Sequence, residues 1–282
     1  MKQFILTKEP DKDNTVRLKG NDYKYLVRVR RLAVGEFFPA LLPNGEEIQI
    51  QITSIDSNTL TGKCLNVSIG SSDSSAPQTG EPAGSGSMRL CENISPVILF
   101  QAMPKGDKMD LIARQAAEGG ITEIVPFISE FSIAKAVSAD KQKFTRWERI
   151  IKEARQQSGS KIATSLRPVL SMNELFEYWQ KLKKKDSTGL LFHHIPPENS
   201  SCGGLETKSL HEYLYSNLKK TPVVFVIGPE GGFSEKEVSL FLENGFNHIT
   251  IGDTILRTET AALYCAAAIR VILLERNTWE MK

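Results

Sequence analysis

The sequence has little of what marks disulfide-rich or metal-binding proteins. It holds four cysteines and four histidines in 282 residues, without a C-x-x-C pair or a histidine at ligand spacing. Disulfide frameworks and structural zinc sites need such spacings, so the isolated thiols predict a reduced, cytoplasmic protein without a metal. His193-His194 ends an apolar stretch and has no further ligands beside it.

Long apolar runs and an excess of one charge are also missing. No run reaches the roughly 18 apolar residues of a membrane-spanning helix, and the opening MKQFIL lacks the apolar core of a signal peptide. With 35 basic and 33 acidic residues the net charge is only +2. Any nucleic-acid surface must therefore be local. The glycine-rich loops match neither G-x-x-x-x-G-K-[ST] nor G-x-G-x-x-G, which argues against a P-loop or dinucleotide site.

Two segments near the C-terminus carry most of the information. Residues 223–234 read VVFVIGPEGGFS, and residues 249–261 read ITIGDTILRTETA. Each is a β-branched strand that ends in glycine, followed by a tight loop and a helix start. Glycine at a strand end lets backbone approach a ligand closely, and α/β folds bind ligands at the carboxyl edge of the sheet. A plain Gly-Pro turn before a capped helix explains the first loop equally well.

The helix starts after both loops are also predictable. Ser234 and Glu237 have the S-x-x-E spacing of a capping box, so a helix should begin at Ser234. Residues 258–275 are rich in strong helix formers. Helix capping explains a threonine there but not Arg257, a cation where the helix dipole disfavours it. This favours a functional role for Arg257.

The paired motifs I-G-P-E-G-G-F-S-x-x-E and I-x-I-G-x-x-I-L-R-T-E-T-A-A resemble those of the RsmE family of ribosomal RNA uridine methyltransferases, in the SPOUT superfamily. The resemblance continues upstream and covers most of the chain outside a low-complexity insert. Its further segments are KGDKM at 105–109, ITEIVPF at 121–127, WERI at 147–150, LVRVRR at 26–31 and Gly35-Glu36. It implies an α/β fold with an N-terminal PUA-like β-barrel and a C-terminal SPOUT domain. Only the resemblance supports the trefoil knot of that domain, because knots are nearly absent from proteins.

One domain boundary is plain in the sequence. Residues 70–87 contain almost no apolar side chains and cannot bury enough surface to offset their ordering entropy. We therefore expect an RNA-binding PUA-like barrel at 1–69, a flexible linker at 70–88 and a methyltransferase domain at 89–282. In the first domain, strands at 36–42 and 46–55 joined by Pro43-Asn44-Gly45 should form a hairpin, with another strand at 59–69.

Strands and helices alternate in the C-terminal part, which predicts a largely parallel sheet covered by helices. The expected strands are 97–101, 121–128, 189–193, 223–227 and 248–251. The expected helices are 107–118, 141–157, 205–218, 234–242 and 258–275. The last helix is apolar on more than one face. It should therefore be buried on both sides, which predicts a homodimer.

Basic side chains gather at a few places. Three arginines fall within 28–31, and residues 141–161 hold seven basic against two acidic side chains. Solvated surfaces explain such runs, but beside a cofactor fold they favour contact with RNA phosphates. The predicted RNA-binding residues are Arg28, Arg30, Arg31, Lys105, Lys108, Arg146, Arg149 and Lys152.

The resemblance implies S-adenosylmethionine as cofactor and N3 of a uridine in small-subunit (16S) ribosomal RNA as the methylated atom. The expected cofactor-binding residues are Ile227, Gly228, Gly232, Ile251, Gly252, Ile255, Leu256 and Ala261. Arg257 should stabilise the uridine anion that loss of the N3 proton creates. Glu230 or Glu259 could accept that proton, or either could be a structural carboxylate that satisfies loop amides.

The chain departs from the family pattern on the expected RNA side, while both cofactor loops remain intact. The departures are Tyr25, Gln115, Phe131, Gln156, Ser160 and Thr164. They leave other functions open: methylation of another RNA site, such as a ribose 2′-hydroxyl, or a non-catalytic RNA-binding module for ribosome assembly. The target nucleotide, the general base and the choice between naked RNA and an assembled subunit are open too.

Overall fold

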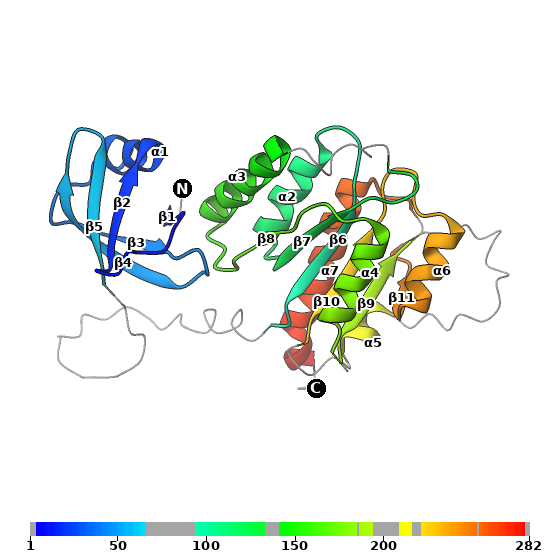
Figure 1. Cartoon of the computed structure of the whole chain (residues 1–282). Helices are drawn as coiled ribbons and strands as arrows, with labels where there is room; N and C mark the ends of the chain where they lie inside the picture. The colour runs from blue at the N-terminus through cyan, green and yellow to red at the C-terminus, as the bar shows by residue number, and fades with distance from the viewer. Residues whose placement is uncertain are drawn as a thin grey trace. The chain divides into compact units, whose positions relative to one another are not determined.

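The computed structural model describes residues 4–65, 94–132, 141–184, 186–193, 209–215, 221–252 and 254–279 (Figure 1). The predicted linker at 70–88 lies outside these ranges. The chain forms two compact units, one spanning Met1–Ala83 with Arg155–Ala163 and one spanning Gly84–Ala154 with Thr164–Lys282. No helix in the part of the chain that the structure describes is long and apolar enough to cross a membrane.

The N-terminal unit is a five-stranded sheet with the order β1-β3-β4-β5-β2. Its strands are β1 (Phe4–Ile5), β2 (Thr15–Lys19), β3 (Phe37–Leu41), β4 (Glu47–Ile55) and β5 (Thr59–Leu65). β1 pairs in parallel with β3, and the other pairs are antiparallel. The predicted hairpin is confirmed: Leu42 N donates to Glu46 O at 2.8 Å, and Gly45 takes a φ of 96°, which favours glycine.

The arginine-rich segment of this unit lies in helical turns that the sequence did not predict. Helix α1 (Gly20–Tyr23) runs into a π-helix, η1 (Lys24–Val29). Leu26 is fully buried, and the Tyr23 hydroxyl donates to Asp56 O at 2.9 Å, so these turns are anchored to the sheet. Buried side chains at helical spacing hold the segment against the core, and its three arginines stay exposed.

The C-terminal unit is built on six parallel strands in the order β11-β9-β10-β6-β7-β8. The strands are β6 (Val97–Ala102), β7 (Glu123–Phe127), β8 (Ser165–Leu166), β9 (Thr188–Phe192), β10 (Val223–Ile227) and β11 (Phe246–Ile249). The helices are α2 (Lys108–Glu118), α3 (Lys141–Ser158), α4 (Met172–Leu182), α5 (Leu210–Tyr215), α6 (Glu235–Glu243) and α7 (Thr258–Trp279). The predicted parallel α/β architecture is confirmed.

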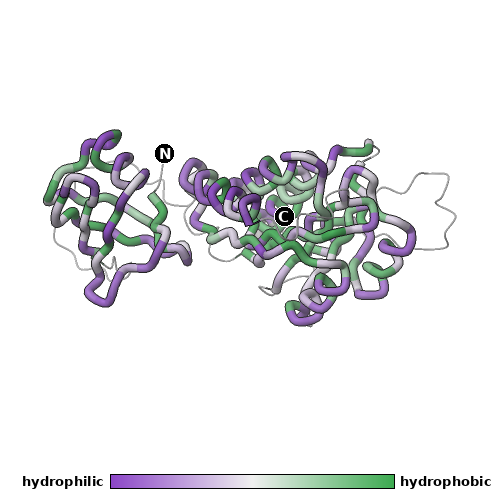
Figure 2. Tube along the Cα trace, turned by 45° about the horizontal axis from the view of Figure 1, so that its top comes forward, coloured by the Kyte–Doolittle hydropathy of each residue, from purple (hydrophilic) through white to green (hydrophobic). Residues whose placement is uncertain are grey.

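Helices cover both faces of this sheet. Along β10, Val223, Phe225 and Ile227 face a core shared with α2, α3, α5 and α7, whereas Val224 and Val226 face a core shared with α4 and α6. Figure 2 shows hydrophobic residues along the interior strands and hydrophilic ones on outer helical turns. A strand buried on both faces reads as a continuous apolar run, which is why β10 was predicted with its observed bounds.

Other boundaries differ from the prediction. β11 begins and ends two residues before the predicted 248–251, because its backbone pairs with Gly189–Phe192 of β9 only from Phe246 to Ile249. Helix α4 and strand β8 were missed. The predicted helix at 205–218 is seen only as α5, since its ends lie outside the described residues.

Candidate active site

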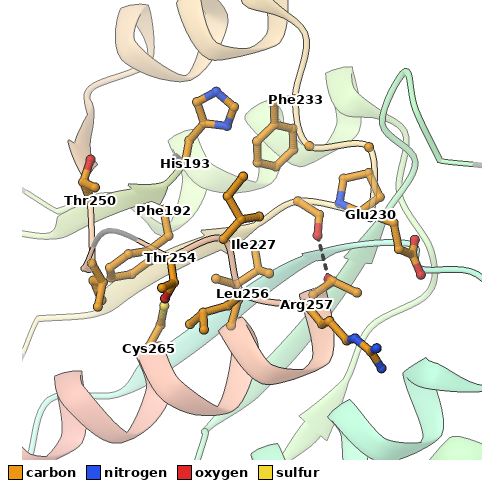
Figure 3. Close-up of a pocket in the computed structure, with 18 of the residues that line it drawn as sticks. Phe192, His193, Ile227, Glu230, Phe233, Thr250, Thr254, Leu256, Arg257 and Cys265 are labelled. Carbon is orange, nitrogen blue, oxygen red and sulfur yellow. Dashed lines mark hydrogen bonds between the residues drawn. The ribbon is translucent and has the colours of Figure 1, made fainter. Parts of the chain in front are cut away.

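The two glycine loops come together at the carboxyl end of the sheet. They enclose a cavity of about 610 Å³ (Figure 3). The first loop lines it with residues 227–233, and the second with residues 249–251 and 254–257. Phe192 of β9 and His193, which follows it, also line the cavity, and α7 contributes Thr258, Ala261 and Cys265. This cavity therefore lies at the edge of the sheet where the sequence predicted a binding site.

Seven of the eight predicted cofactor residues line this cavity: Ile227, Gly228, Gly232, Ile251, Ile255, Leu256 and Ala261. Gly252 lies in the same loop with a φ of 67° but outside the cavity lining. The sequence interpretation missed Phe192 and His193. Their position at the end of β9, the neighbour of β10, is the signal that could have found them.

The glycines of the first loop serve the packing of that loop. A Cβ at Gly228 would lie 3.3 Å from the Phe233 ring, and Gly232 has a φ of 70°. A Cβ at Gly231 would lie 2.9 Å from Cβ of Phe131, one of the departures from the family pattern. Gly232 is thus favoured by its backbone conformation, and Gly228 and Gly231 by tight packing against Phe233 and Phe131, in addition to any close approach of a ligand.

His193 forms part of the cavity wall. Its ring lies 6.2 Å from that of Phe233, and its carbonyl oxygen lies 2.7 Å from Nε2 of His248. Among the described residues no group of three or more histidine, cysteine, aspartate or glutamate side chains could hold a metal ion.

An acid–base cluster lies at the cavity rim. Lys108 Nζ is 2.7 Å from Glu230 Oε1 and 3.4 Å from Glu259 Oε2. The backbone N–H of Lys105 donates to both carboxylate oxygens of Glu230 at 3.1 and 3.2 Å. Partial burial acts to raise the pKa of Glu230, but the bonds from Lys108 and Lys105 outweigh it and hold that pKa below its ordinary value. A carboxylate with a lowered pKa is a weaker base, so Glu230 fits the role of a structural carboxylate that satisfies loop amides better than that of the proton acceptor.

Lys108 was predicted to contact RNA, but in the structure its ammonium is paired at this rim. The hydrogen bond to Glu230 raises the pKa of Lys108.

Arg257, in contrast to Lys108, is not paired in the described part of the chain. Its guanidinium has no hydrogen bond or ion pair to any residue in the described ranges, and its side chain points away from Phe192 and Phe233 in Figure 3. Arg257 is thus an exposed cation at the cavity edge, and its carbonyl accepts the first α7 bond, from Ala261 N at 2.8 Å.

The predicted basic side chains of α3 are exposed or half-buried, but they are not equivalent. Arg146 forms an ion pair with Asp110, which also accepts from Trp147 Nε1 at 3.0 Å, so Arg146 links α3 to α2. Arg149 Nε lies 3.7 Å from Glu153 Oε1 on the same exposed face. In the N-terminal unit Arg28, Arg30 and Arg31 are all exposed.

Two family models match this chain. An RNA methyltransferase domain matches residues 91–270, and an RNA methyltransferase PUA domain matches residues 18–64. The chain belongs to the RNA methyltransferase family. Within it, several curated relatives place the chain among the RsmE proteins, and the first unit is PUA-like.

Two relatives cover nearly all of the chain. Ribosomal RNA small subunit methyltransferase E 2 of Borreliella burgdorferi is 29% identical over 98% of this chain and 100% of its own length. The ribosomal RNA small subunit methyltransferase E of Bacillus subtilis is 27% identical over 90% of this chain and 89% of its own. Both RsmE proteins thus extend across the two units.

A solved structure shares the whole fold. The ribosomal RNA small subunit methyltransferase E of Neisseria gonorrhoeae, bound to S-adenosylmethionine, matches with a TM-score of 0.69 at 24% identity, covering 96% of this chain and 98% of its own. At that identity the likeness supports the two-unit fold of the RsmE family. The trefoil knot stays a prediction.

Proposed function

We propose that the chain is an S-adenosylmethionine-dependent methyltransferase that acts on N3 of a uridine in small-subunit (16S) ribosomal RNA in the cytoplasm. The observation that carries this is the cavity, because both glycine loops of the RsmE-like motif line it. We further propose the domain limits 1–69 and 89–282, with a linker between them.

The residues present fit the cofactor. A cavity of about 610 Å³ lies within the range of small-ligand sites, roughly 300–1,000 Å³. Ile227, Ile251 and Leu256 offer apolar contacts for a purine ring. The backbone groups of the two loops offer the polar contacts that an amino-acid portion needs. Bound there, the cofactor would supply an electrophilic methyl group.

The chain's own residues then have two tasks. The loops must hold the donor in line with the uridine nitrogen, because orientation lowers the barrier of such a transfer. A group at the rim must stabilise the anion that loss of the N3 proton creates. Arg257 is exposed at the cavity edge, without a competing carboxylate in the described ranges, and a planar guanidinium suits a planar, delocalised anion. Glu259 stays a candidate for the proton acceptor.

RNA is the proposed partner, in the small subunit's ribosomal RNA or its assembled particle. The exposed Arg28, Arg30 and Arg31 support phosphate contacts by the PUA-like unit. In the second unit Lys105, Arg149 and Lys152 are the candidates, whereas Lys108 and Arg146 would first have to leave Glu230 and Asp110. Of the two arginines, Arg149 is the stronger candidate, because its partner Glu153 is exposed and 3.7 Å away, whereas Arg146 is held by the more buried Asp110.

A homodimer is supported by α7. Tyr264 and Val271 are 52% and 46% exposed, and Leu263 is 40% exposed. Their spacing places them along one side of the helix, opposite buried residues such as Ile269. A second copy of the chain would cover this apolar stripe.

Mass spectrometry of ribosomal RNA from cells with and without the gene tests the function. Loss of a single N3-methyluridine from the small-subunit RNA, restored by the intact gene and not by Arg257→Ala, is the expected result. Loss of a different mark, such as a 2′-O-methyl group, would contradict the proposed target. No loss of any mark would contradict the enzymatic function.

A further inference from the structure

A short chain of buried polar groups ends at the cavity, whose lining includes Thr258. Gln101, on β6, is fully buried and paired in register with Ile227 of β10. Thr258, the first residue of α7, is 4% exposed. Burying such groups in an apolar interior is costly unless they are hydrogen-bonded, so their presence needs an explanation.

The donor and the acceptor of each hydrogen bond between these groups follow from the atoms involved. Gln101 Nε2 donates to Ala102 O at 2.9 Å and to Thr258 Oγ1 at 3.1 Å. A backbone carbonyl can only accept, so the amino end of the Gln101 amide must face this side. The Thr258 hydroxyl therefore accepts from Gln101 and uses its own proton in the 2.6 Å bond to Gly228 O, which is drawn as a dashed line in Figure 3.

The bond to Gly228 joins the two cofactor loops. Proline follows Gly228, so their peptide group has no N–H, and its carbonyl is the only polar group that it offers. Thr258 closes the second loop and opens α7. One hydroxyl thus connects the first loop to the end of the second, and both loops line the cavity.

Ordinary helix capping does not account for this arrangement. A capping hydroxyl accepts from a backbone N–H in the first turn of its own helix. The Thr258 hydroxyl instead accepts from Gln101 and donates across to Gly228. Gln101 Oε1 is buried without a hydrogen-bond partner in the part of the chain that the structure describes. A buried oxygen without a partner destabilises the fold, and an apolar residue at position 101 would avoid that cost.

We propose that Gln101 and Thr258 are positioning residues that hold the two cofactor loops at their binding separation before the cofactor arrives. The proposal rests on the proposed function, because the ligand of the cavity is taken to be S-adenosylmethionine. Loops that are already ordered lose less entropy on binding, so the tie should appear in the affinity. Gln101 lies outside the cavity lining, and Thr258, which is part of that lining, would act through the loops that it joins.

The test compares three variants with the wild-type full chain. Thr258→Val keeps the shape and removes the hydroxyl, and Thr258→Ser keeps the hydroxyl. Thr164→Val is the matched control, because the Thr164 hydroxyl is also buried and donates to a carbonyl, Ile121 O, at 2.7 Å. The measurements are calorimetric titration with S-adenosylmethionine, hydrogen exchange of the amides of residues 230–233 without cofactor, and the thermal midpoint.

We expect Thr258→Val to weaken binding about tenfold, the factor that the net free energy of one hydrogen bond corresponds to. Exchange of the loop amides should speed up by a similar factor. Thr258→Ser should behave like the wild type in both measurements. Thr164→Val should lower the thermal midpoint as Thr258→Val does, with affinity and loop exchange unchanged.

The proposal is overturned if Thr258→Val matches Thr164→Val in affinity and in loop exchange. If Thr258→Val does not fold, Thr258→Ala replaces it, since it also removes the hydroxyl. Gln101→Met, which leaves the bond from Thr258 to Gly228 in place, should weaken binding by a smaller factor. A wild-type chain that does not bind S-adenosylmethionine would instead contradict the proposed function. The exchange measurement would then still decide whether the hydroxyl ties the loops.

Discussion

Lys108 Nζ lies 2.7 Å from Glu230 Oε1, so a side chain at the start of α2 is paired with one from the first glycine loop. The pairing lowers the pKa of Glu230 against the opposing effect of partial burial. A group whose pKa is lower in the folded state contributes stability above its unfolded pKa, about 4.3 for glutamate, and loses it as the pH falls through the folded value.

Glu230→Gln should therefore flatten the acid side of the stability profile. The wild-type thermal midpoint should fall more steeply than that of Glu230→Gln as the pH drops below about 4.3. The effect should be modest, about 1 kcal/mol or less, because both side chains stay partly exposed. Glu177→Gln, at an exposed position in the middle of α4, is the control and should follow the wild type. Equal slopes for all three proteins would show that the pair has no energetic role.

Arg257 provides the sharpest catalytic prediction. Arg257→Ala should lower kcat by roughly 10²–10³, the usual loss when a group that stabilises developing charge is removed. Cofactor affinity should change far less, since backbone and apolar contacts hold the cofactor. Arg257→Lys should restore little, because a point charge on a flexible stem does not reproduce the planar guanidinium. Single-turnover methyl transfer beside a calorimetric cofactor titration measures both quantities. Equal losses in rate and binding would remove Arg257 from the catalytic residues.

The exposed stripe of α7 predicts a dimer that a charge can break. Tyr264→Glu or Val271→Glu should convert a dimer into a monomer at micromolar concentration, because a buried unpaired carboxylate is strongly unfavourable. Sedimentation velocity measures the change. Val34→Glu, at a position of the first unit that is 59% exposed, is the control and should leave the dimer intact. A wild-type chain that sediments as a pure monomer contradicts the prediction.

Tyr178 predicts a loss of stability at high pH. Desolvation and then its hydrogen bond to Glu123 raise the pKa of Tyr178 to about 12, while Arg167 packs on the ring and opposes the shift. A raised pKa contributes stability that is full below the unfolded value, near 10, and disappears as the pH rises through the folded value. Between roughly pH 10 and 12, Tyr178→Phe should therefore lose less stability than the wild type. Urea unfolding at pH 8 and pH 11 compares them, and parallel losses would contradict the assignment.

Several elements could be predicted because their signals are local. The hairpin around Gly45, the capping box of Ser234 and Glu237, and the start of α7 at Thr258 all follow from a few neighbouring residues. The same kind of signal existed for α4, whose Ser171 and Glu174 also form a capping box, and it was overlooked.

Elements that depend on partners were placed less well. β11 was predicted too late because its β-branched run continues past Ile249, whereas pairing with β9 sets its limits. The turns of α1 and η1 were missed because packing of Tyr23 and Leu26 against the sheet stabilises them, and no strong local signal does.

The sequence by itself determined the parallel α/β class, the two glycine loops and seven residues of the cavity lining. The class and the loops follow from periodicity and turn chemistry, which act over a few residues, and the lining residues follow from the resemblance of the two motifs to the RsmE family. Only the tertiary structure decided that Lys108 pairs with Glu230 and Glu259, and that Gln101 reaches Thr258, 157 positions away. Such contacts depend on which strand ends meet at one edge of the sheet, and that order arises from packing of the whole domain.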